Sequence, residues 1–98
     1  MAVTPVCLVG PPRLLPALDI ERFASANPQL RLHFVDYDVT TELRLARAQR
    51  RLTPELLATE PTISAADRVA LAEAVAVVAL DLPTGVAELA PNLRFVQA

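Results

Sequence analysis

Short, uninterrupted apolar segments alternate along this chain with segments that have the pattern of helices. The strand-like segments are "PVCLVG" (5–10), "LRLHFVDYD" (30–38), "AVAVVALDL" (74–82) and "LRFVQA" (93–98). Continuous apolar strands of this kind are typical of a parallel sheet that is covered on both faces. We therefore expect an α/β domain with the element order β-α-β-α-α-β-α-β and right-handed crossovers.

Hydroxyl and acidic residues mark the starts of three predicted helices. The sequences Thr-Thr-Glu (40–42), Thr-Pro-Glu (53–55) and Ser-Ala-Ala-Asp (64–67) place a side-chain oxygen before a helix and an acid in its first turn. The oxygen can accept a hydrogen bond from a free backbone N–H group, and the helix dipole stabilises the acid. The first of these helices is expected to present Leu45, Ala48 and Leu52 as its apolar face.

The apolar positions of the strands and of the first helix form the predicted core. The chain is 53% hydrophobic, which is enough for one domain spanning 1–98, and no linker or repeat divides it. The predicted core residues are Val6, Leu8, Val9, Ile20, Phe23, Leu32, Phe34, Val77, Val78, Leu80, Phe95 and Val96.

Missing residue types exclude several kinds of functional site. The chain contains no lysine, which excludes a P-loop lysine and a Schiff-base lysine. Its two glycines, Gly10 and Gly85, cannot form the G-x-G-x-x-G loop of a dinucleotide-binding domain. One Cys and one His are too few ligands for a structural zinc site.

Charge and hydropathy limit the partners and the compartment. A net charge of -2 gives no general attraction to nucleic acid or to anionic membranes. The longest apolar run, residues 74–80, is too short to cross a bilayer, and "MAVTPVC" lacks the pattern of a signal peptide. Because a single cysteine fits a reducing compartment, we predict a cytoplasmic protein without a nucleic-acid or membrane partner.

Ligands of open parallel α/β sheets bind at the carboxyl ends of the strands. In this sequence those ends read "GPPR", "DYDV", "DLPTG" and "QA". The acids of "DYD" (36–38) lie where a dinucleotide fold holds the ribose, but the glycine loop that this function needs is absent. The remaining hypotheses are a polar strand end and a substrate contact made by Tyr37.

Four arginines lie within one arc of the helix that begins near residue 41, opposite its apolar face. Such an arc could bind phosphate groups, but no aromatic residues lie between the arginines, as a nucleic-acid surface would require. We interpret the arc as a solvent-exposed face. The four residues are Arg44, Arg47, Arg50 and Arg51.

Three residues inside the apolar strands carry polar or reactive groups. We interpret Cys7 as an inert core thiol and His33 as a buried or half-buried structural histidine. A Cys7–His33 dyad is conceivable, but groups in the middle of a strand lie away from the edge where substrates bind. Asp81 needs a partner if it is buried, or could work with Asp36 as paired carboxylates. The sequence leaves both roles of Asp81 open.

The last third of the chain resembles one family. Residues 66–98 read "ADRVALAEAVAVVALDLPTGVAELAPNLRFVQA", in which an apolar strand ends in a proline turn and a short helix leads through "APNL" to an aromatic-containing strand. This stretch is similar to the N-terminal part of the substrate-binding (catalytic) domain of the D-isomer-specific 2-hydroxyacid dehydrogenases. The first strand and helix agree with that family in layout only.

The resemblance implies a fold and a set of substrate-rim residues. By analogy with flavodoxin-like sheets, we expect an open sheet of four parallel strands in the order 2-1-3-4, with helices on both faces. In the family, side chains that follow the strands shape the pocket for the 2-oxo acid when the cleft closes. The matching residues are Asp36, Tyr37, Leu82, Pro83, Gln97 and Ala98.

The resemblance also implies that these 98 residues are a truncated domain. The family's anion-binding loop, NAD-binding domain and catalytic residues have no counterpart here, so we assign no catalytic, cofactor-binding or metal residue. The isolated chain is expected to be inactive. In the full-length protein, NAD or NADP would transfer a hydride to or from the substrate.

The alternative hypothesis is a complete small flavodoxin-like module that binds a partner without catalysis. Fold alone does not decide between the two hypotheses, because one fold can serve many functions. A truncated domain exposes apolar surface that other elements would cover, and such surface drives association. We therefore expect the chain to associate with itself, through an unpaired sheet edge.

Overall fold

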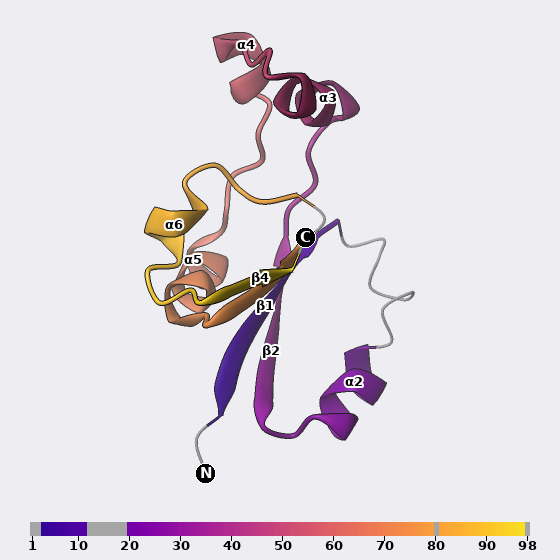
Figure 1. Ribbon diagram of the computed structural model, residues 1–98, viewed down its shortest axis with the longest axis vertical. Helices are drawn as coiled ribbons and strands as arrows, with labels where there is room; N and C mark the ends of the chain where they lie inside the picture. Colours follow the sequence, from indigo (N-terminus) through magenta and orange to yellow (C-terminus); the bar gives the residue numbers. More distant parts are fainter. Residues whose placement is uncertain (1–2, 12–19, 80, 98) are drawn as a thin grey trace.

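The computed structural model describes residues 3–11, 20–79 and 81–97 and has an α/β fold built on a four-stranded parallel sheet (Figure 1). The strand order is β2-β1-β3-β4, which confirms the predicted order 2-1-3-4. The elements are β1 (Thr4–Gly10), α2 (Ile20–Ala26), β2 (Leu30–Asp36), α3 (Thr41–Gln49), α4 (Pro54–Leu57), α5 (Ala65–Glu73), β3 (Ala76–Ala79), α6 (Val86–Leu89) and β4 (Phe95–Gln97).

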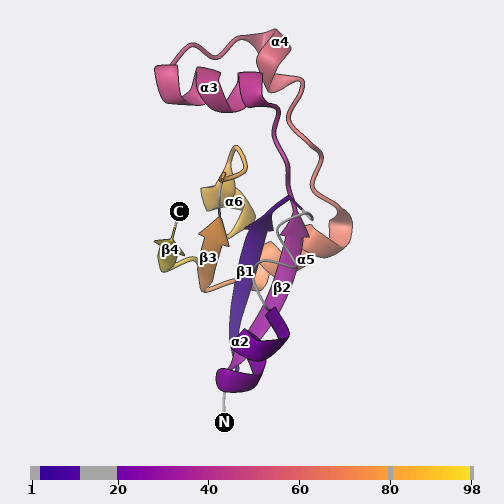
Figure 2. The ribbon, with the colours of Figure 1, turned by 90° about the vertical axis from the view of Figure 1, so that its right-hand side faces the viewer.

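The parallel pairing brings the carboxyl ends of the strands to one edge of the sheet. β1 pairs with both β2 and β3, and β3 pairs with β4. Gly10, the last residue of β1, lies opposite Asp36, the last residue of β2. Figure 2 shows α3 and α4 standing beyond this edge, in the direction in which the strands point. We call α3 and α4 the helical arm.

The two faces of the sheet are covered unequally. α5 and α6 lie on one face and α2 lies on the other (Figure 1). Residues that are register partners in a parallel sheet point to the same face, so Cys7, His33 and Val77 share the face on which α5 packs its buried Leu71. On the opposite face α2 contacts β2, at the far side of the sheet from β4.

The best-buried residues gather on the α5 face and at the base of the arm. They are Cys7, Val9, Val35, Tyr37, Val39, Leu43, Ile63, Leu71, Ala74, Val77 and Ala79. The burial of Val6, Val9 and Val77 confirms that part of the predicted core. Leu8, Leu32 and Phe34 are half-buried, and the side chain of Ile20 and residue Leu80 lie outside the part of the chain that the structure describes.

Four residues predicted to lie in the core are exposed instead. Phe23 is 47% exposed, Val78 42%, Phe95 58% and Val96 41%. For Val78, Phe95 and Val96 the prediction was wrong because it assumed equal cover on both faces of every strand. Val78 points to the α2 face, where α2 packs mainly on β2, and β4 is the outer strand of the described sheet.

Side-chain caps begin α3, α4 and α5 where the sequence predicts them. The hydroxyls of Thr40, Thr53 and Ser64 each accept a hydrogen bond from the backbone N–H group three residues later, at 3.1–3.2 Å. Each bond satisfies one of the free donors at a helix N-terminus. At its other end α3 is closed by Arg50, which has a left-handed backbone with φ 55°.

The helix α3 turns a different face inward from the predicted one. Leu43 is 0% and Ala46 6% exposed, whereas Leu45 is 54% and Leu52 46% exposed, and α3 ends before Leu52. Ala48 is exposed as well. Positions three and four residues apart lie on one face of a helix, so Arg47 shares the inward face with Leu43. This shift in phase brings an arginine to the edge of the sheet.

Candidate functional site

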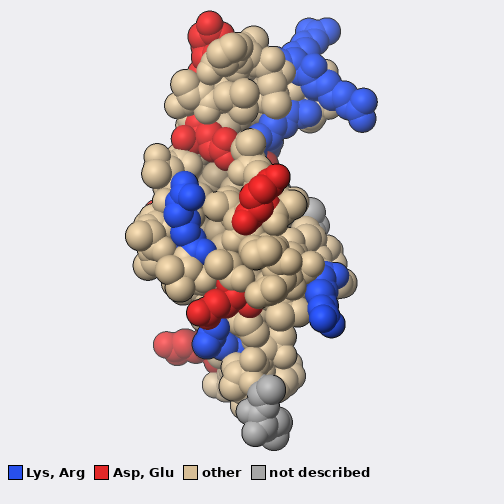
Figure 3. All heavy atoms as spheres, turned by 90° about the vertical axis from the view of Figure 1, so that its left-hand side faces the viewer, with Lys and Arg blue, Asp and Glu red and all other residues tan. Residues whose placement is uncertain are grey.

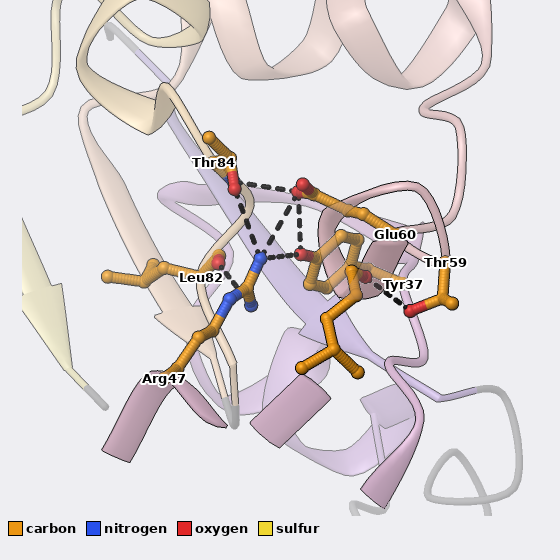
Figure 4. A network of polar contacts seen from close by, with 7 residues as sticks. Tyr37, Arg47, Thr59, Glu60, Leu82 and Thr84 are labelled. Carbon is orange, nitrogen blue, oxygen red and sulfur yellow. Dashed lines mark hydrogen bonds and ion pairs between the residues drawn. The ribbon is translucent and has the colours of Figure 1, made fainter. Parts of the chain in front are cut away.

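The loops that follow β2 and β3 meet the helical arm at the carboxyl edge of the sheet. Tyr37 follows β2, is 1% exposed, and donates its backbone N–H to the carbonyl of Gly10 at 3.0 Å. This bond continues the pairing of β1 and β2 by one residue and so fixes the tyrosine. The loop after β3 brings Leu82, Pro83 and Thr84 to the same edge (Figure 4).

Arg47 of α3 joins these two loops to the arm. Its guanidinium donates to the hydroxyl of Tyr37 at 2.9 Å, to the carbonyl of Leu82 at 3.2 Å and to the hydroxyl of Thr84 at 3.1 Å. It also forms an ion pair with Glu60, with Nη2 and Oε1 3.4 Å apart. The side chain of Arg47 is 21% exposed. One arginine therefore holds groups from three separate segments.

The carboxylate of Glu60 lies at the centre of this network. Its Oε1 accepts a hydrogen bond from the Tyr37 hydroxyl at 2.8 Å and from the Thr84 backbone N–H at 2.8 Å. Figure 4 shows Tyr37, Thr84 and Arg47 converging on it from three directions. We call the donors of these three residues the carboxylate cradle. A hydroxyl, a backbone N–H and a guanidinium form a donor set suited to a carboxylate.

The pKa values of Glu60 and Tyr37 are both shifted in this network. Burial opposes the ionisation of Glu60, but the hydrogen bonds from Thr84 and Tyr37 and the charge of Arg47 outweigh it, so the pKa of this carboxyl lies below its ordinary value. Burial raises the pKa of Tyr37 to about 12, because the hydrogen bond from Arg47 offsets only part of the burial effect. At neutral pH Glu60 is ionised, and Tyr37 is protonated and donates a hydrogen bond to it.

A second ion pair ties the arm to the loop after β3. Arg44 donates through Nε and Nη2 to Oδ2 of Asp81, at 2.9 and 2.8 Å. The hydrogen bonds and charge of Asp81 raise the pKa of Arg44. The side chain of Asp81 is 15% exposed, so Arg44 is the partner that its burial requires. Asp36, with which Asp81 could form paired carboxylates, is exposed at the end of β2.

The interpretation of the arginine arc as a solvent-exposed face is therefore wrong for two of its members. Arg44 and Arg47 point to the sheet edge and hold acids, because the inward face of α3 differs from the predicted one. Arg50 and Arg51 are exposed, as predicted. In Figure 3 basic side chains gather on one side of the arm, which also carries acidic side chains at its top, and both kinds are interspersed over the rest of that face.

His33 and Cys7 are neighbours on the α5 face and lie away from the cradle. They are register partners in β1 and β2. His33 Nε2 lies 2.7 Å from Oδ1 of Asp67 on α5, and its side chain is 41% exposed, which confirms a half-buried structural histidine. Burial, with a smaller effect of the Asp67 charge, raises the pKa of the Cys7 thiol to about 11. The thiol is protonated at neutral pH, which agrees with an inert core cysteine.

The structure places the predicted rim residues in different surroundings. Tyr37, Leu82 and Pro83 come together at the edge, with Tyr37 and Pro83 buried and Leu82 half-buried. Asp36 and Gln97 are exposed at the ends of β2 and β4. Ala98 lies outside the described residues. The predicted set is thus split between an inner group around Arg47 and an outer, solvent-facing group.

Sequence reasoning did not identify Glu60 and Thr84. Glu60 lies between α4 and α5, and Thr84 lies in a turn, so neither has a helical or strand pattern that would mark it. Glu60 and Thr84 are 24 positions apart, and Tyr37 and Glu60 are 23 apart. The sequence offered one signal for this network: Leu43, Ala46 and Arg47 share a face of α3, which indicates that Arg47 points inward and needs an acidic partner.

The described residues contain no group of three or more His, Cys, Asp or Glu side chains that could hold a metal ion. None of the helices in that same part of the chain has the length and apolar character that crossing a membrane requires. Comparisons with protein-family models, with curated proteins and with solved structures gave no match.

Proposed function

We propose that this chain is the substrate-binding domain of an NAD(P)-dependent D-2-hydroxyacid dehydrogenase, an oxidoreductase that interconverts 2-oxo acids and 2-hydroxy acids. The observation that carries the proposal is the carboxylate cradle at the carboxyl edge of a parallel 2-1-3-4 sheet. Ligands of open α/β sheets bind at this edge, and both substrates of the reaction carry a carboxylate beside the reacting carbon. The resemblance of residues 66–98 to this family supports the same reaction.

The proposal gives the edge residues a part in substrate binding and none in proton or hydride transfer. In this proposal Tyr37 contributes a hydroxyl, and Leu82, which is half-buried beside it, contributes apolar surface to the side chain of a 2-oxo acid, with the buried Pro83 behind it. In this proposal Asp36, Gln97 and Ala98 keep the outer substrate-rim role that the resemblance implies. These groups orient the substrate, which is how a binding domain contributes to the rate of a reaction.

The residues of this chain do not fit the dinucleotide itself. The strand β1 ends at Gly10, which is followed by Pro11 and Pro12, two residues without a backbone N–H group. A pyrophosphate needs several free N–H groups at such a turn. In the proposed enzyme NAD or NADP is therefore held by another domain, and this chain contributes no step that involves it.

The proposal is tested with the protein encoded by the whole reading frame. NADH or NADPH oxidation is followed by absorbance in the presence of a panel of 2-oxo acids. We expect turnover that requires both the 2-oxo acid and the reduced cofactor, and none from the 98-residue chain. A whole-frame protein that is folded, binds no dinucleotide and turns over none of the 2-oxo acids would contradict the proposal.

A second candidate function is a binding module without catalysis. It is favoured by the exposed apolar side chains of β4, where Phe95 is 58% and Val96 41% exposed. The Phe95 N–H donates to the carbonyl of Val75, so the N–H of the next residue, Val96, points away from β3 toward the open edge. An apolar strand at the outer edge of the described sheet can pair with another strand. This function predicts association that 2-oxo acids do not change.

A further inference from the structure

The carboxylate cradle is a complete receptor for one carboxylate, and a residue of the chain itself occupies it. The donors are the Tyr37 hydroxyl, the Thr84 backbone N–H and the Arg47 guanidinium, at 2.8, 2.8 and 3.4 Å from Oε1 of Glu60. All three belong to segments other than the one that supplies the carboxylate. The side chain of Glu60 is 18% exposed, so solvent reaches the site.

Two of the three donor residues, Tyr37 and Arg47, are held more firmly than the carboxylate that they bind, whereas Thr84 is exposed. Tyr37 is 1% exposed, and α3, which carries Arg47, buries Leu43 completely. Glu60 follows α4, a four-residue helix without a fully buried residue, in which only Leu56 is partly buried against the core. Residues 58 and 59, which precede Glu60, are exposed. Segments that bury little apolar surface open at low free-energy cost, so Glu60 can leave the cradle while the donors stay in place.

We propose that the cradle is a binding site for a free carboxylate ligand and that Glu60 is an internal occupant that this ligand displaces. Withdrawal of Glu60 would leave three convergent donors at the edge where ligands of parallel sheets bind. The Tyr37 hydroxyl and the Thr84 backbone N–H would then lose their acceptor, and Arg47 would lose its ion-pair partner while keeping its other hydrogen bonds. A small carboxylate would restore the lost interactions. The ligand class is a monocarboxylate of low molecular weight.

Displacement makes the affinity of the native chain for carboxylates low and tunable. Glu60 competes as an intramolecular group, with an effective concentration on the order of millimolar or higher. Any contact that draws the α4 segment away from the edge would raise the affinity for the ligand. The inference of a carboxylate site does not depend on the proposed dehydrogenase activity, but the identification of its ligand as a 2-oxo acid rests on the proposed function.

The test is chemical rescue of Glu60→Ala. This variant removes the occupant and keeps all three donors. We expect its Tm to fall, and we expect acetate to restore the Tm and to bind with an affinity at least ~10-fold higher than in the native chain. Acetamide, which has the shape of acetate without its charge, is expected to restore much less. The double variant Glu60→Ala, Arg47→Met is expected to lose the response to acetate.

A second variant covers the case in which Glu60→Ala does not fold. Glu60→Gln keeps the size of the side chain and weakens the pairing with Arg47, and acetate should again bind it more tightly than it binds the native chain. The inference is overturned if acetate affects the variants and the native chain equally, or if acetamide restores as much as acetate. Pyruvate, a 2-oxo acid, separates the two proposals. If acetate rescues Glu60→Ala and pyruvate binds this variant no more tightly than acetate does, the result supports the cradle and contradicts the dehydrogenase proposal.

Discussion

Replacing Arg47 with methionine should separate the helical arm from the sheet edge. The variant keeps most of the length and apolar stem of the side chain but removes the guanidinium. Three hydrogen bonds, to Tyr37, Leu82 and Thr84, and the ion pair with Glu60 are lost together. Helix propensity changes little, because Arg and Met are similar helix formers.

The expected cost follows from the contacts. A hydrogen bond to a charged group contributes roughly 1.5–3 kcal/mol and a neutral one about 1 kcal/mol, but groups that water can reach recover part of this. With Arg47 21% exposed, we expect a loss of about 2–3 kcal/mol in the free energy of unfolding. For a chain of 98 residues this corresponds to a fall in Tm of roughly 10–20 °C.

Urea unfolding followed by circular dichroism measures this loss, and Arg51→Met is the matched control. Arg51 is exposed and follows the same helix, so its replacement should change the free energy of unfolding by less than about 0.5 kcal/mol. A double-mutant cycle with Glu60→Gln should give a coupling of roughly 1 kcal/mol or more. If Arg47→Met costs no more than Arg51→Met, the network is not what holds the arm, and this reasoning is refuted.

Four further predictions follow from single features. The chain has one Tyr and no Trp, so ultraviolet absorbance titrates Tyr37 directly; its pKa should be about 12 in the folded chain, and a value near 10 would show that the hydroxyl is not buried. Because folding lowers the pKa of Glu60, the ionised carboxylate stabilises the fold fully above the unfolded pKa near 4.5, and this stabilisation is lost as the pH falls through the folded pKa. The difference in the free energy of unfolding between the native chain and Glu60→Gln, measured by urea titration, should therefore shrink as the pH falls. Arg50→Gly should raise the free energy of unfolding by about 0.5–1 kcal/mol, since glycine adopts the left-handed φ of 55° without strain; a loss of stability would contradict this. Light scattering should detect concentration-dependent association of the native chain that Phe95→Glu reduces, and a native chain that is monomeric at all concentrations would count against an open β4 edge.

Local patterns were sufficient to predict the elements and their order. Continuous apolar segments marked the strands, and hydroxyl residues at positions 40, 53 and 64 marked three helix starts, because both signals depend on neighbours in sequence. The strand order also agreed with the prediction.

Side-chain surroundings were harder to predict, because they depend on which element covers which. Val78 and Phe95 have the apolarity of core residues but lie where the described helices give little cover. The face of α3 was mistaken because Leu45 and Leu52 are larger than Ala46, which is the residue that packs inward with Leu43. Because the wrong face of α3 was predicted to point inward, the inward direction of Arg47 was missed as well.

The network around Glu60 could not be predicted from the sequence, because it too depends on how the elements are arranged in space. Tyr37, Glu60 and Thr84 are separated by more than twenty positions from one another and meet only once the sheet and the arm are assembled. Hydrogen bonds between residues so far apart in the sequence leave no periodic pattern in it. Asp81 is the informative contrast, since its position inside an apolar segment required a partner without saying that the partner is Arg44.

The most direct test of the carboxylate cradle is the amide resonance of Thr84. Its backbone N–H donates to Glu60 at 2.8 Å, and a hydrogen bond to a carboxylate moves an amide proton downfield. In ¹⁵N–¹H spectra of Glu60→Ala the Thr84 proton should move upfield, and added acetate should return it to its native position, with Tyr37 and Arg47 the other residues affected. If acetate leaves the resonances of Thr84, Tyr37 and Arg47 in Glu60→Ala unchanged, this fold has no carboxylate site at the edge of the sheet.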